Sequence, residues 1–503
     1  MRSRPGAGTG GDGFVDAAGV GRGSWFALDE DQRNREAELS AVSFFNTGPV
    51  SHELRICVQE RSQETERLLV PPGRLVLAGE PLGLSSGTAL AEIWEAGRVD
   101  AELKIRTLWL QDLLSIGPAT FTLGLRRDTQ DLGAPVAYGA ETLSPRLGMT
   151  YALGPQRKTV LRATLARYTS QFGTEISLAA QPESLRAASF VLQDGEPPVF
   201  AFATNPLAIS RDLAPEVTDE AALEVEYALL PEMLIGLRGT WRRTTNVLEE
   251  RWLVRDEASG AVYAATSDDW IQAGTVDGVG WFDLRPGLEW IGSRQLANGD
   301  RSRDAFDLVA SWNKRLTNRW MSRGHVAWHD WTWQVDPEAL RFDDPTTALG
   351  GGDQDGQRVL LPAGGAVLPH EPVRFLGSRW SFHLMGTRQL PRGFNVSLAV
   401  DGHEGVPLAW YRQVLRERAG LVRVPVSGPG ARTSDLVTTD FLLTKELAWD
   451  RDLHLTLSLD VFNLLNTGTV AERELDLGVG RAAEATRVVA PRTFRVGARV
   501  SWR

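Results

Sequence analysis

The stretch VDAELKIRTLW, from Val99 to Trp109, decides the fold class because it alternates apolar and polar residues. One register carries Val99, Ala101, Leu103, Ile105 and Trp109, and the other carries Asp100, Glu102, Lys104 and Arg106. A period of two residues gives a β-strand one apolar and one polar face. A run of about ten residues is long enough to cross a bilayer at a tilt, and it exceeds the usual strand of about five or six residues. The stretch therefore favours a transmembrane β-barrel, with the charged register facing a wet lumen.

The same alternation recurs over most of the chain, and sustained helical periodicity is hard to find. The fold class is therefore predicted to be all-β. Strands are predicted around residues 54–58, 99–109, 121–126, 223–227, 235–242, 306–312, 380–384, 394–400, 455–461 and 494–502. In all, roughly 16 to 18 strands can be identified, fewer than the about 22 strands of the largest plugged barrels.

Composition excludes several classes of protein. The 503 residues include one cysteine, Cys57, so a disulfide scaffold and the usual cysteine-based zinc modules are excluded. No apolar run approaches the about 18 residues of a membrane helix. The net charge of −10 argues against a nucleic-acid partner. A hydrophobic content of 42% suits a barrel, because only every second residue of its strands meets lipid.

The connections between the predicted strands fall into two kinds. Short turns are predicted at residues 390–393 and 448–452. Long polar loops are predicted at Gln171–Glu220, Leu253–Gly278 and Val335–Ser378. Outer-membrane barrels have short turns at one rim and long loops at the other. Loops of this length are usually functional or disordered, so these three are the candidate extracellular ligand-binding region, in which no individual binding residue is identified.

Tryptophan is abundant, with 17 residues, and several lie in the apolar register near strand ends. Such residues form the aromatic girdles of outer-membrane barrels. The predicted girdle comprises Trp109, Trp241, Trp312, Trp320, Trp380 and Trp502. One alternative is a large sandwich or propeller core, although the sequence lacks the repeat of about 40–50 residues that a propeller requires. The other is a soluble β-rich carbohydrate-binding or adhesion protein whose tryptophans stack on sugars.

Motifs that could support catalysis or metal binding are weak. Residues Gly83 to Gly87 fit the G-x-S-x-G pattern, but the following residues, Thr88 to Trp94, read as a strand where a nucleophile elbow needs a helix. His325 and His329 share one strand face about 13 Å apart, too far to chelate one metal. No enzyme activity, cofactor or metal is therefore predicted.

Other charged groups have simple interpretations. His383 is expected on the polar face of another strand. Asp353 and Asp355 lie in a glycine-rich loop that lacks the other carboxylates of a calcium site. A group of basic residues is interpreted as lumenal or loop charge: Arg412, Arg416, Arg418 and Arg423.

Several segments, in order, resemble the barrel of TonB-dependent outer-membrane receptors, particularly the Oar-like branch. Leu459–Asn466 (LDVFNLLN) is similar to the late-barrel motif of that family, and Pro491–Arg499 (PRTFRVGAR) to its final strand. The earlier similarities are to a strand opening, the strand after it and a hairpin: Leu143–Gly148 (LSPRLG), Arg162–Tyr168 (RATLARY), and Trp109–Asp112 (WLQD) followed by Gly124–Arg126 (GLR).

The resemblance implies import of a scarce ligand (a siderophore, oligosaccharide or peptide) through a barrel of about 22 strands in the outer membrane of a Gram-negative bacterium. Its implied partners are outer-membrane lipid and the barrel-assembly machinery, which would use the C-terminal strand Phe494–Trp502. TonB is a partner only if an N-terminal plug and TonB box exist. Residues 36–503 are expected to form a large, incomplete, monomeric version of this barrel. Residues 1–35 are expected to be a disordered or truncated leader.

Overall fold

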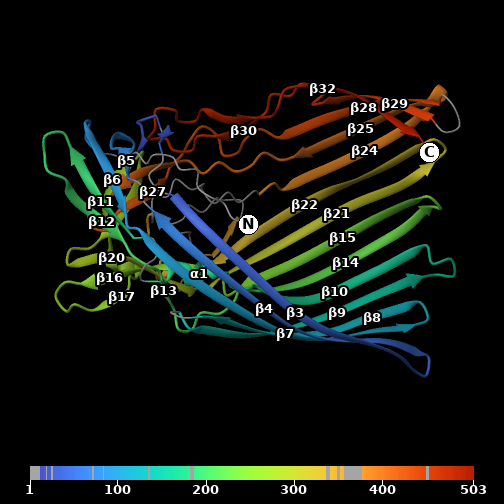
Figure 1. The fold of residues 1–503 in the computed structure, drawn as a ribbon, viewed down its shortest axis with the longest axis horizontal. Coiled ribbons are helices and arrows are strands. Elements are labelled where there is room, and N and C mark those ends of the chain that lie inside the picture. Colours follow the sequence, from blue (N-terminus) through green and yellow to red (C-terminus); the bar gives the residue numbers. More distant parts are fainter. Residues whose placement is uncertain are drawn as a thin grey trace.

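The computed structural model describes residues 12–502, with gaps at 19, 24–26, 71–72, 83, 134–135, 182–185, 336–339, 348–351, 356–376 and 449–452. The molecule consists of one large curved sheet with a mass of smaller sheets at one end (Figure 1). The prediction of an all-β chain is confirmed. Among the described residues no helix is long and apolar enough to cross a membrane.

The large sheet has sixteen strands, of which fifteen pair with their neighbours in chain order and antiparallel, while β23 pairs with β22. This number falls within the predicted range. The strands are β3 (Ala27–Thr47), β4 (Val50–Val70), β7 (Gly97–Ile116), β8 (Ala119–Leu132), β9 (Tyr138–Leu153), β10 (Thr159–Thr169), β14 (Val217–Leu230), β15 (Met233–Thr245), β21 (Arg301–Thr317), β22 (Trp320–Val335), β23 (Gly352–Asp355), β24 (Trp380–Leu390), β25 (Phe394–His403), β28 (Leu436–Ala448), β29 (Leu453–Phe462) and β32 (Thr493–Trp502). Each of the ten strand ranges predicted above for the barrel lies within one of them, whereas the strand predicted at Thr88–Trp94 belongs to the smaller six-stranded sheet.

Short turns join the strands at the end of the sheet opposite the smaller sheets (Figure 1). Thr47 and Val50 pair directly across a two-residue loop in which Gly48 has a φ of 61°. Asn318 and Arg319 both have positive φ, 51° and 64°. Two-residue hairpins favour such turns because their twist matches the right-handed twist of the strands. The predicted turn at 390–393 is the short 3-10 helix η4 (Pro391–Gly393), and the one at 448–452 lies largely outside the described residues.

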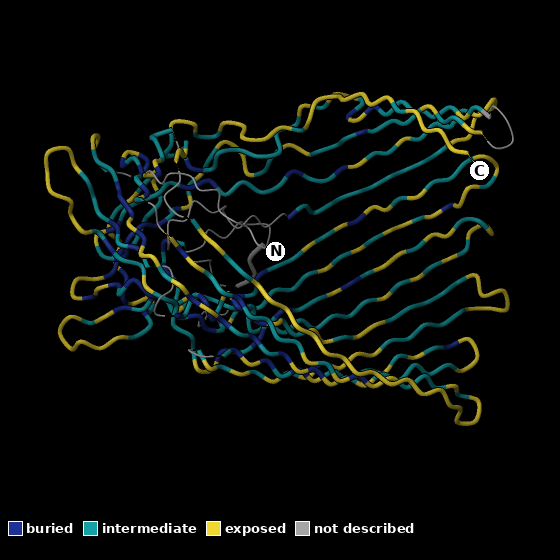
Figure 2. The backbone as a smooth tube through the Cα atoms, in the orientation of Figure 1, coloured by how far each residue is buried: buried dark blue, intermediate teal, exposed yellow. Residues whose placement is uncertain are grey.

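The long connections fold into a cap at the other end. Its elements are β1 (Gly13–Val15), β2 (Gly21–Arg22), β5 (Arg74–Ala78), η1 (Glu80–Leu82), β6 (Thr88–Trp94), α1 (Thr174–Ala179), β11 (Ala187–Gln193), β12 (Val199–Thr204), β13 (Ala208–Ile209), β16 (Leu248–Asp256), β17 (Val262–Ala264), η2 (Ser267–Asp269), β18 (Trp270–Val276), β19 (Val279–Leu284), β20 (Leu288–Asn298), β26 (Tyr411–Leu415), β27 (Leu421–Pro425), β30 (Val470–Arg473) and β31 (Ala485–Val488). Buried residues concentrate there (Figure 2). Its main hydrophobic core includes Leu75, Leu90, Trp252, Trp270 and Trp290, so the loops form a packed layer with a core of their own.

Two expectations about the organisation of the chain are corrected. Residues 12–35, as far as they are described, do not form a disordered leader, because they contain β1, β2 and the start of β3. The predicted loop Leu253–Gly278 is only part of a longer insertion that runs from the end of β15 to the start of β21. The sequence-based boundaries were too narrow because the strands inside this insertion alternate as those of the large sheet do.

Candidate functional site

The convex face of the large sheet is apolar over the half that adjoins the short turns. On β7, Leu108 and Leu110 are each 46% exposed, and Leu237 on β15 is 50% exposed. Pairing in register places further exposed apolar residues on the same face. This apolar band includes Ile56, Val58, Leu108, Leu110, Leu123, Leu125, Leu147, Leu165, Leu223, Leu237, Phe306, Leu308, Val326 and Trp328. A continuous apolar face of this extent is far larger than water-soluble monomers usually expose.

The apolar side chains of β7 change to the opposite face of the sheet where the strand leaves this band, while the same inward register stays the more buried one. Leu103 and Ile105 are 1% and 3% exposed and pack against cap residues such as Phe172. The alternating charged residues, such as Arg106, lie on the convex face with Leu108. The expectation that the charges of residues 99–109 face a wet lumen is therefore wrong. At this level the inside of the sheet is filled by the cap, so the apolar residues point inward and the charged residues point to water.

A belt of paired charges borders the apolar band on the cap side. Four ion pairs lie within one or two register positions of the last apolar residues: Arg106–Glu60 at 2.9 Å, Arg127–Glu141 at 2.7 Å, Arg167–Asp219 at 2.7 Å and Arg243–Asp304 at 2.7 Å. The hydrogen bond from Arg127 lowers the pKa of Glu141, and the one from Arg167 lowers the pKa of Asp219. The belt marks a sharp change from an apolar to an aqueous environment.

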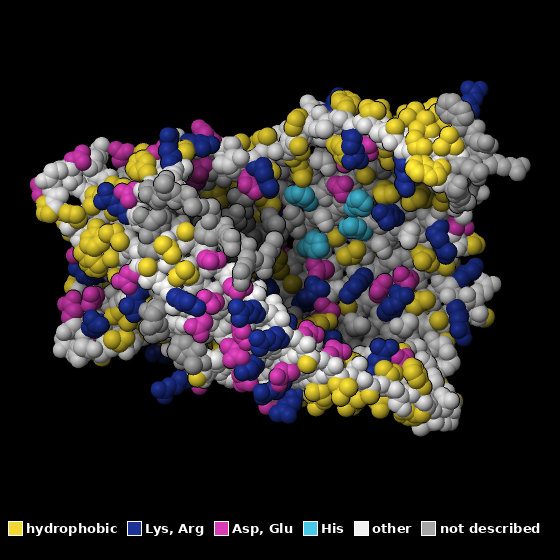
Figure 3. All heavy atoms as spheres, viewed as in Figure 1, with side chains coloured by type: hydrophobic (Ala, Val, Ile, Leu, Met, Phe, Trp, Pro, Cys, Tyr) yellow, Lys and Arg dark blue, Asp and Glu magenta, His cyan; other side chains and the backbone are white. Residues whose placement is uncertain are grey.

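The concave face of the sheet is polar, with charged and histidine side chains in the hollow beside the cap (Figure 3). Arg242 donates to Asp307 at 2.6 Å, and Asp307 also contacts His329 at 2.6 Å. His383 contacts Asp401 at 2.5 Å, and its ring centroid lies 6.2 Å from that of His325, its direct cross-strand partner. Within the described ranges, no group of three or more His, Cys, Asp or Glu residues could hold a metal ion. The concave face of the sheet instead presents hydrogen-bond donors and acceptors side by side toward the hollow.

Five of the six tryptophans expected in the girdle lie in the register of the convex face. Trp241 precedes the charged belt, Trp312 and Trp320 flank the short turn at Asn318, and Trp502 is 77% exposed at the end of β32. Trp380 pairs directly with Trp328. Trp328 lies in the same register as Val326, so the sequence pattern could have identified it as a further residue of the girdle.

Trp109 is the exception. Its register places it between Cys57 and Arg126, on the concave polar face, opposite to Leu108 and Leu110. The prediction that Trp109 belongs to the girdle is therefore wrong. The apolar register of residues 99–109 faces inward toward the cap, and Trp109 continues that register below it.

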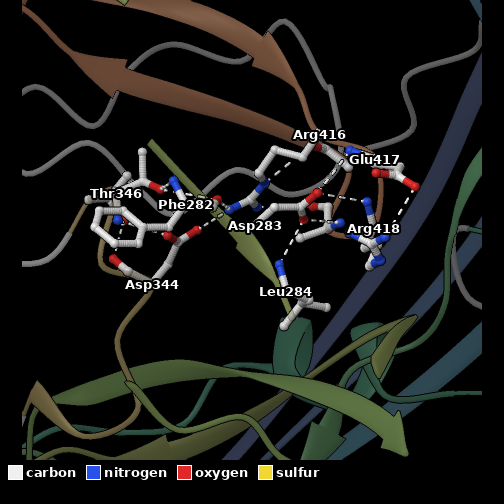
Figure 4. Close-up of polar contacts among 11 residues, drawn as sticks. Phe282, Asp283, Leu284, Asp344, Thr346, Arg416, Glu417 and Arg418 are labelled. Carbon is white, nitrogen blue, oxygen red and sulfur yellow. Dashed lines mark hydrogen bonds and ion pairs between the residues drawn. The ribbon is translucent and has the colours of Figure 1, made fainter. Parts of the chain in front are cut away.

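Three cap loops meet at one buried cluster of polar groups (Figure 4). The Arg416 side chain is fully buried and donates to Asp344 at 2.6 Å and to the backbone oxygens of Phe282, Ala419 and Gly420. Its guanidinium also lies 5.0 Å and 5.2 Å from the ring centroids of two tryptophans, Trp252 and Trp270.

Asp283 completes this cluster. Its carboxylate accepts the backbone N–H groups of Glu417, Arg418 and Ala419 at 2.9–3.1 Å. The cluster therefore holds three parts of the cap together: strand β19, the segment containing Asp344, and the loop between β26 and β27. The expectation of lumenal or loop charge is wrong for Arg416, which is a core residue of the cap. Arg412 is half-buried and pairs with Asp277 at 2.5 Å.

A cavity of about 370 Å³ opens in the cap between β12, the start of β20 and the turn at Arg418. Its lining combines aromatic residues with charges of both signs: Phe200, Phe202, Trp290, Arg255, Glu289 and Arg418. The predicted loop Gln171–Glu220 contributes β12, and Leu253–Gly278 contributes Arg255 and Glu257. The sequence analysis did not identify the β26–β27 loop as part of a ligand-binding region. The residues on either side of this loop alternate as those in the strands of the large sheet do.

The remaining sequence motifs form no site among the residues that the structure describes. Ser85 and Ser86 lie in the turn before β6, which is a strand as predicted. Most of Val335–Ser378 lies outside the described residues. Asp353 and Asp355 belong to β23, and their side chains also lie outside the described part.

Comparison with known proteins gives the fold. No family model matches the sequence, and no curated protein matches it. Among solved structures, the outer membrane transporter YddB from Escherichia coli is similar with a TM-score of 0.56 at 11% identity, over 98% of this chain and 57% of that chain. The ferric-catecholate import receptor Fiu from Escherichia coli K12 and the ferric preacinetobactin receptor BauA from Acinetobacter baumannii are each similar with a TM-score of 0.53 at 12% identity, over 97% of this chain and 57% of theirs.

The chain thus spans a little more than half the length of these receptors, over nearly all of its own. The large antiparallel sheet matches the barrel region of TonB-dependent outer-membrane receptors. Identity of 11–12% supports this statement about the fold alone. The similar structures are receptors and transporters by name.

Proposed function

We propose that this chain forms the wall and extracellular cap of an outer-membrane receptor that imports a scarce ligand. The observation that carries the proposal is the apolar band with its border of paired charges. On β15 the band runs from Met233 to Trp241, and on β7 it runs from Leu108 to Ile116, where the His52–Asp112 pair interrupts it near the short turns. These lengths suit the about 9–11 residues that a tilted strand needs to cross a bilayer. The fold similarity to outer-membrane receptors supports the same location, the outer membrane of a Gram-negative bacterium.

The proposed ligand belongs to the siderophore, oligosaccharide or peptide class, and it would enter through the cap. The cavity beside Trp290 offers aromatic surface and charges of both signs to such a molecule. We propose outer-membrane lipid as the partner of the apolar band, and the barrel-assembly machinery as the partner of β32. TonB would act only through a plug and TonB box.

The second candidate, a soluble carbohydrate-binding or adhesion protein, has less support. It needs tryptophans on exposed loops, whereas Trp252, Trp270 and Trp290 are buried in the cap core and others lie on the convex sheet face. Membrane fractionation separates the two candidates. A membrane protein is expected to resist urea extraction and to show heat-modifiable gel mobility. A chain that stays soluble and binds a glycan array would instead favour the second.

Substitution of Leu237 tests the apolar band directly. Leu237→Arg is expected to lower the unfolding free energy in lipid vesicles by about 2–4 kcal/mol, because a cation is then placed against the middle of the hydrocarbon. The matched control, Arg238→Leu, changes the neighbouring residue on the concave face and is expected to cost within about 0.5 kcal/mol. Urea titrations followed by gel mobility would measure both. A Leu237→Arg variant as stable as the control would contradict insertion of the band.

Residues 1–503 expressed alone are expected not to transport. The elements that the structure describes belong to the wall and the cap, and in the family that the sequence resembles TonB pulls on a plug. A receptor-deletion strain carrying only this chain should fail to grow on ferric enterobactin as its iron source, while the full receptor of that strain restores growth. TonB-dependent growth with this chain alone would overturn the prediction.

A further inference from the structure

Two histidines face each other on the concave side of the large sheet, where histidine side chains gather in the hollow beside the cap (Figure 3). His325 on β22 and His383 on β24 are direct cross-strand partners. Their ring centroids lie 6.2 Å apart, and the ring planes are inclined by 32°. His325 is exposed and the His383 side chain is 36% exposed. The pair is therefore open to small solutes.

A carboxylate fixes the orientation of the His383 ring. Its Nδ1 lies 2.5 Å from a carboxylate oxygen of Asp401, its cross-strand partner on β25. A carboxylate can only accept a hydrogen bond, so Nδ1 carries the proton and the lone pair of the neutral ring is on Nε2. The two nitrogens lie on opposite sides of the imidazole ring. Nε2 therefore points away from β25, toward the side of β24 on which β22 and His325 lie.

The His325 ring has no comparable partner. Among the residues that the structure describes, it contacts the ring of His383 but makes no hydrogen bond. Its partner on the other neighbouring strand, β21, is Ser311. Each of the two histidines thus has a ring nitrogen that no other described residue occupies.

The separation of the two rings suits a single metal ion between them. A Zn–N bond is about 2.0–2.1 Å long, so two imidazoles on one ion place their centroids about 5–6 Å apart. The observed 6.2 Å reaches this range with a small rotation of either side chain. A histidine that binds a metal almost always donates its other ring N–H to a carboxylate, a backbone oxygen or water. Asp401 already accepts from His383 in this way.

We infer that His325 and His383 form a binding site for a divalent transition-metal ion of the class that includes Zn²⁺, Ni²⁺ and Cu²⁺. Imidazole suits these ions, and Cu²⁺ binds most tightly in their series. Each histidine supplies one ring nitrogen, and Asp401 holds the His383 ring in place. The described residues hold no group of three or more ligands, so water or a small chelator carried by the ion fills the remaining positions. The site goes beyond the proposed function, since it requires neither a membrane nor import.

A pair of histidines packed together without any ion is the competing interpretation, and His329 is the residue that separates the two. His329 lies on the same face of β22 and is 38% exposed, close to the value for His383. It also contacts a carboxylate, that of Asp307, at 2.6 Å. It lies about 13 Å from His325, however, and its partner on β21 is Asp307 itself. His329 can therefore give a metal only one imidazole.

Titration with Cu²⁺–iminodiacetate tests the site on the full chain of residues 1–503 in detergent. The chelator fills part of the copper coordination shell and leaves room for two imidazoles. We expect one tightly bound probe per chain, with two imidazoles coupled to the copper in pulsed EPR spectra. His325→Asn and His383→Asn should each weaken binding by about 100-fold or more, because two linked contacts become one. Asp401→Ala should weaken it by about 10–100-fold. The matched control, His329→Asn, should leave the affinity unchanged.

The number of imidazoles in the parent spectrum decides the inference without any variant. A spectrum with one imidazole would overturn it. Equal losses of affinity from His329→Asn and His325→Asn would overturn it as well, because exposed histidines in general would then bind the probe. Heat-modifiable gel mobility shows whether each variant is folded. Membrane fractionation tests the proposed function separately: a membrane-inserted chain without the copper site refutes this inference alone, and a soluble chain with the site refutes the proposed function alone.

Discussion

Replacing Arg416 with methionine is expected to destabilise the cap by about 3–5 kcal/mol. The substitution removes one partner of a fully buried ion pair and leaves the Asp344 carboxylate as an uncompensated charge. It also frees the backbone oxygens of Phe282, Ala419 and Gly420 from their donor. Hydrogen–deuterium exchange of β19 and of the β26–β27 loop measures the loss. Amides in both elements should exchange faster, while those in the middle of β15 should be unaffected.

Two further variants give this experiment its controls. The double variant Arg416→Met with Asp344→Leu should recover much of the loss, because no buried charge is left alone. Arg412→Met removes a cation from the adjoining strand β26, but its pair with Asp277 is partly exposed. It should therefore cost within about 1 kcal/mol. Equal effects of Arg412→Met and Arg416→Met would show that the buried cluster does not hold the loops together.

The cap is also expected to lose stability as the pH rises, through Glu92 on β6. This side chain is 2% exposed, and burial raises its pKa to about 8, with a hydrogen bond from Ser189 opposing the shift. Between the ordinary pKa of 4.5 and about 8, the folded state keeps the proton that the unfolded state releases. The stability that the protonated carboxyl permits is thus fully present below pH 4.5 and declines up to about pH 8. From pH 5 to 7.5 the loss is roughly 3 kcal/mol.

Glu92→Gln tests this pH dependence, because glutamine has nearly the same shape and does not ionise. The variant cap should match the parent near pH 4.5 and exceed it near pH 7.5, with a much flatter dependence between. Urea unfolding followed by exchange of β6 and β11 amides at several pH values measures the difference. Glu95→Gln, just after β6, provides the control for a loss of charge alone. Parallel pH profiles for the parent and Glu92→Gln would refute the role of Glu92.

The fold class was predictable because alternation is a local property of the chain. Leu455 to Val461 and Phe494 to Trp502 alternate in the sequence and are strands β29 and β32. The side of the sheet to which each register points is not a local property. For Val99 to Ile105 the inward side is filled by cap residues that come from other parts of the chain. The alternation alone therefore gave the wrong direction for Asp100 and its charged neighbours.

The candidate site was predictable only in outline. The sequence located the loop that contributes Phe200 and Phe202, since a long polar connection stands out between long strands. The loop with Arg418 was missed, and the burial of Arg416 could not be foreseen. Its partners, Phe282 and Asp344, lie 134 and 72 residues away in the sequence. Contacts at such separations are set by the packing of the cap segments against one another, which no local pattern reports.

The fastening of three loops by Arg416 and Asp283 also bears on how the ligand preference of the proposed receptor can change. Exchanging one loop for that of another receptor would leave either a buried carboxylate or a buried guanidinium without its partner, so single-loop grafts should misfold the recipient cap. Changes confined to the cavity lining, such as those at Phe200 or Glu289, leave the cluster untouched. New specificities in this scaffold are therefore accessible through side-chain substitution in place, and through loop exchange only when the three loops move as one unit.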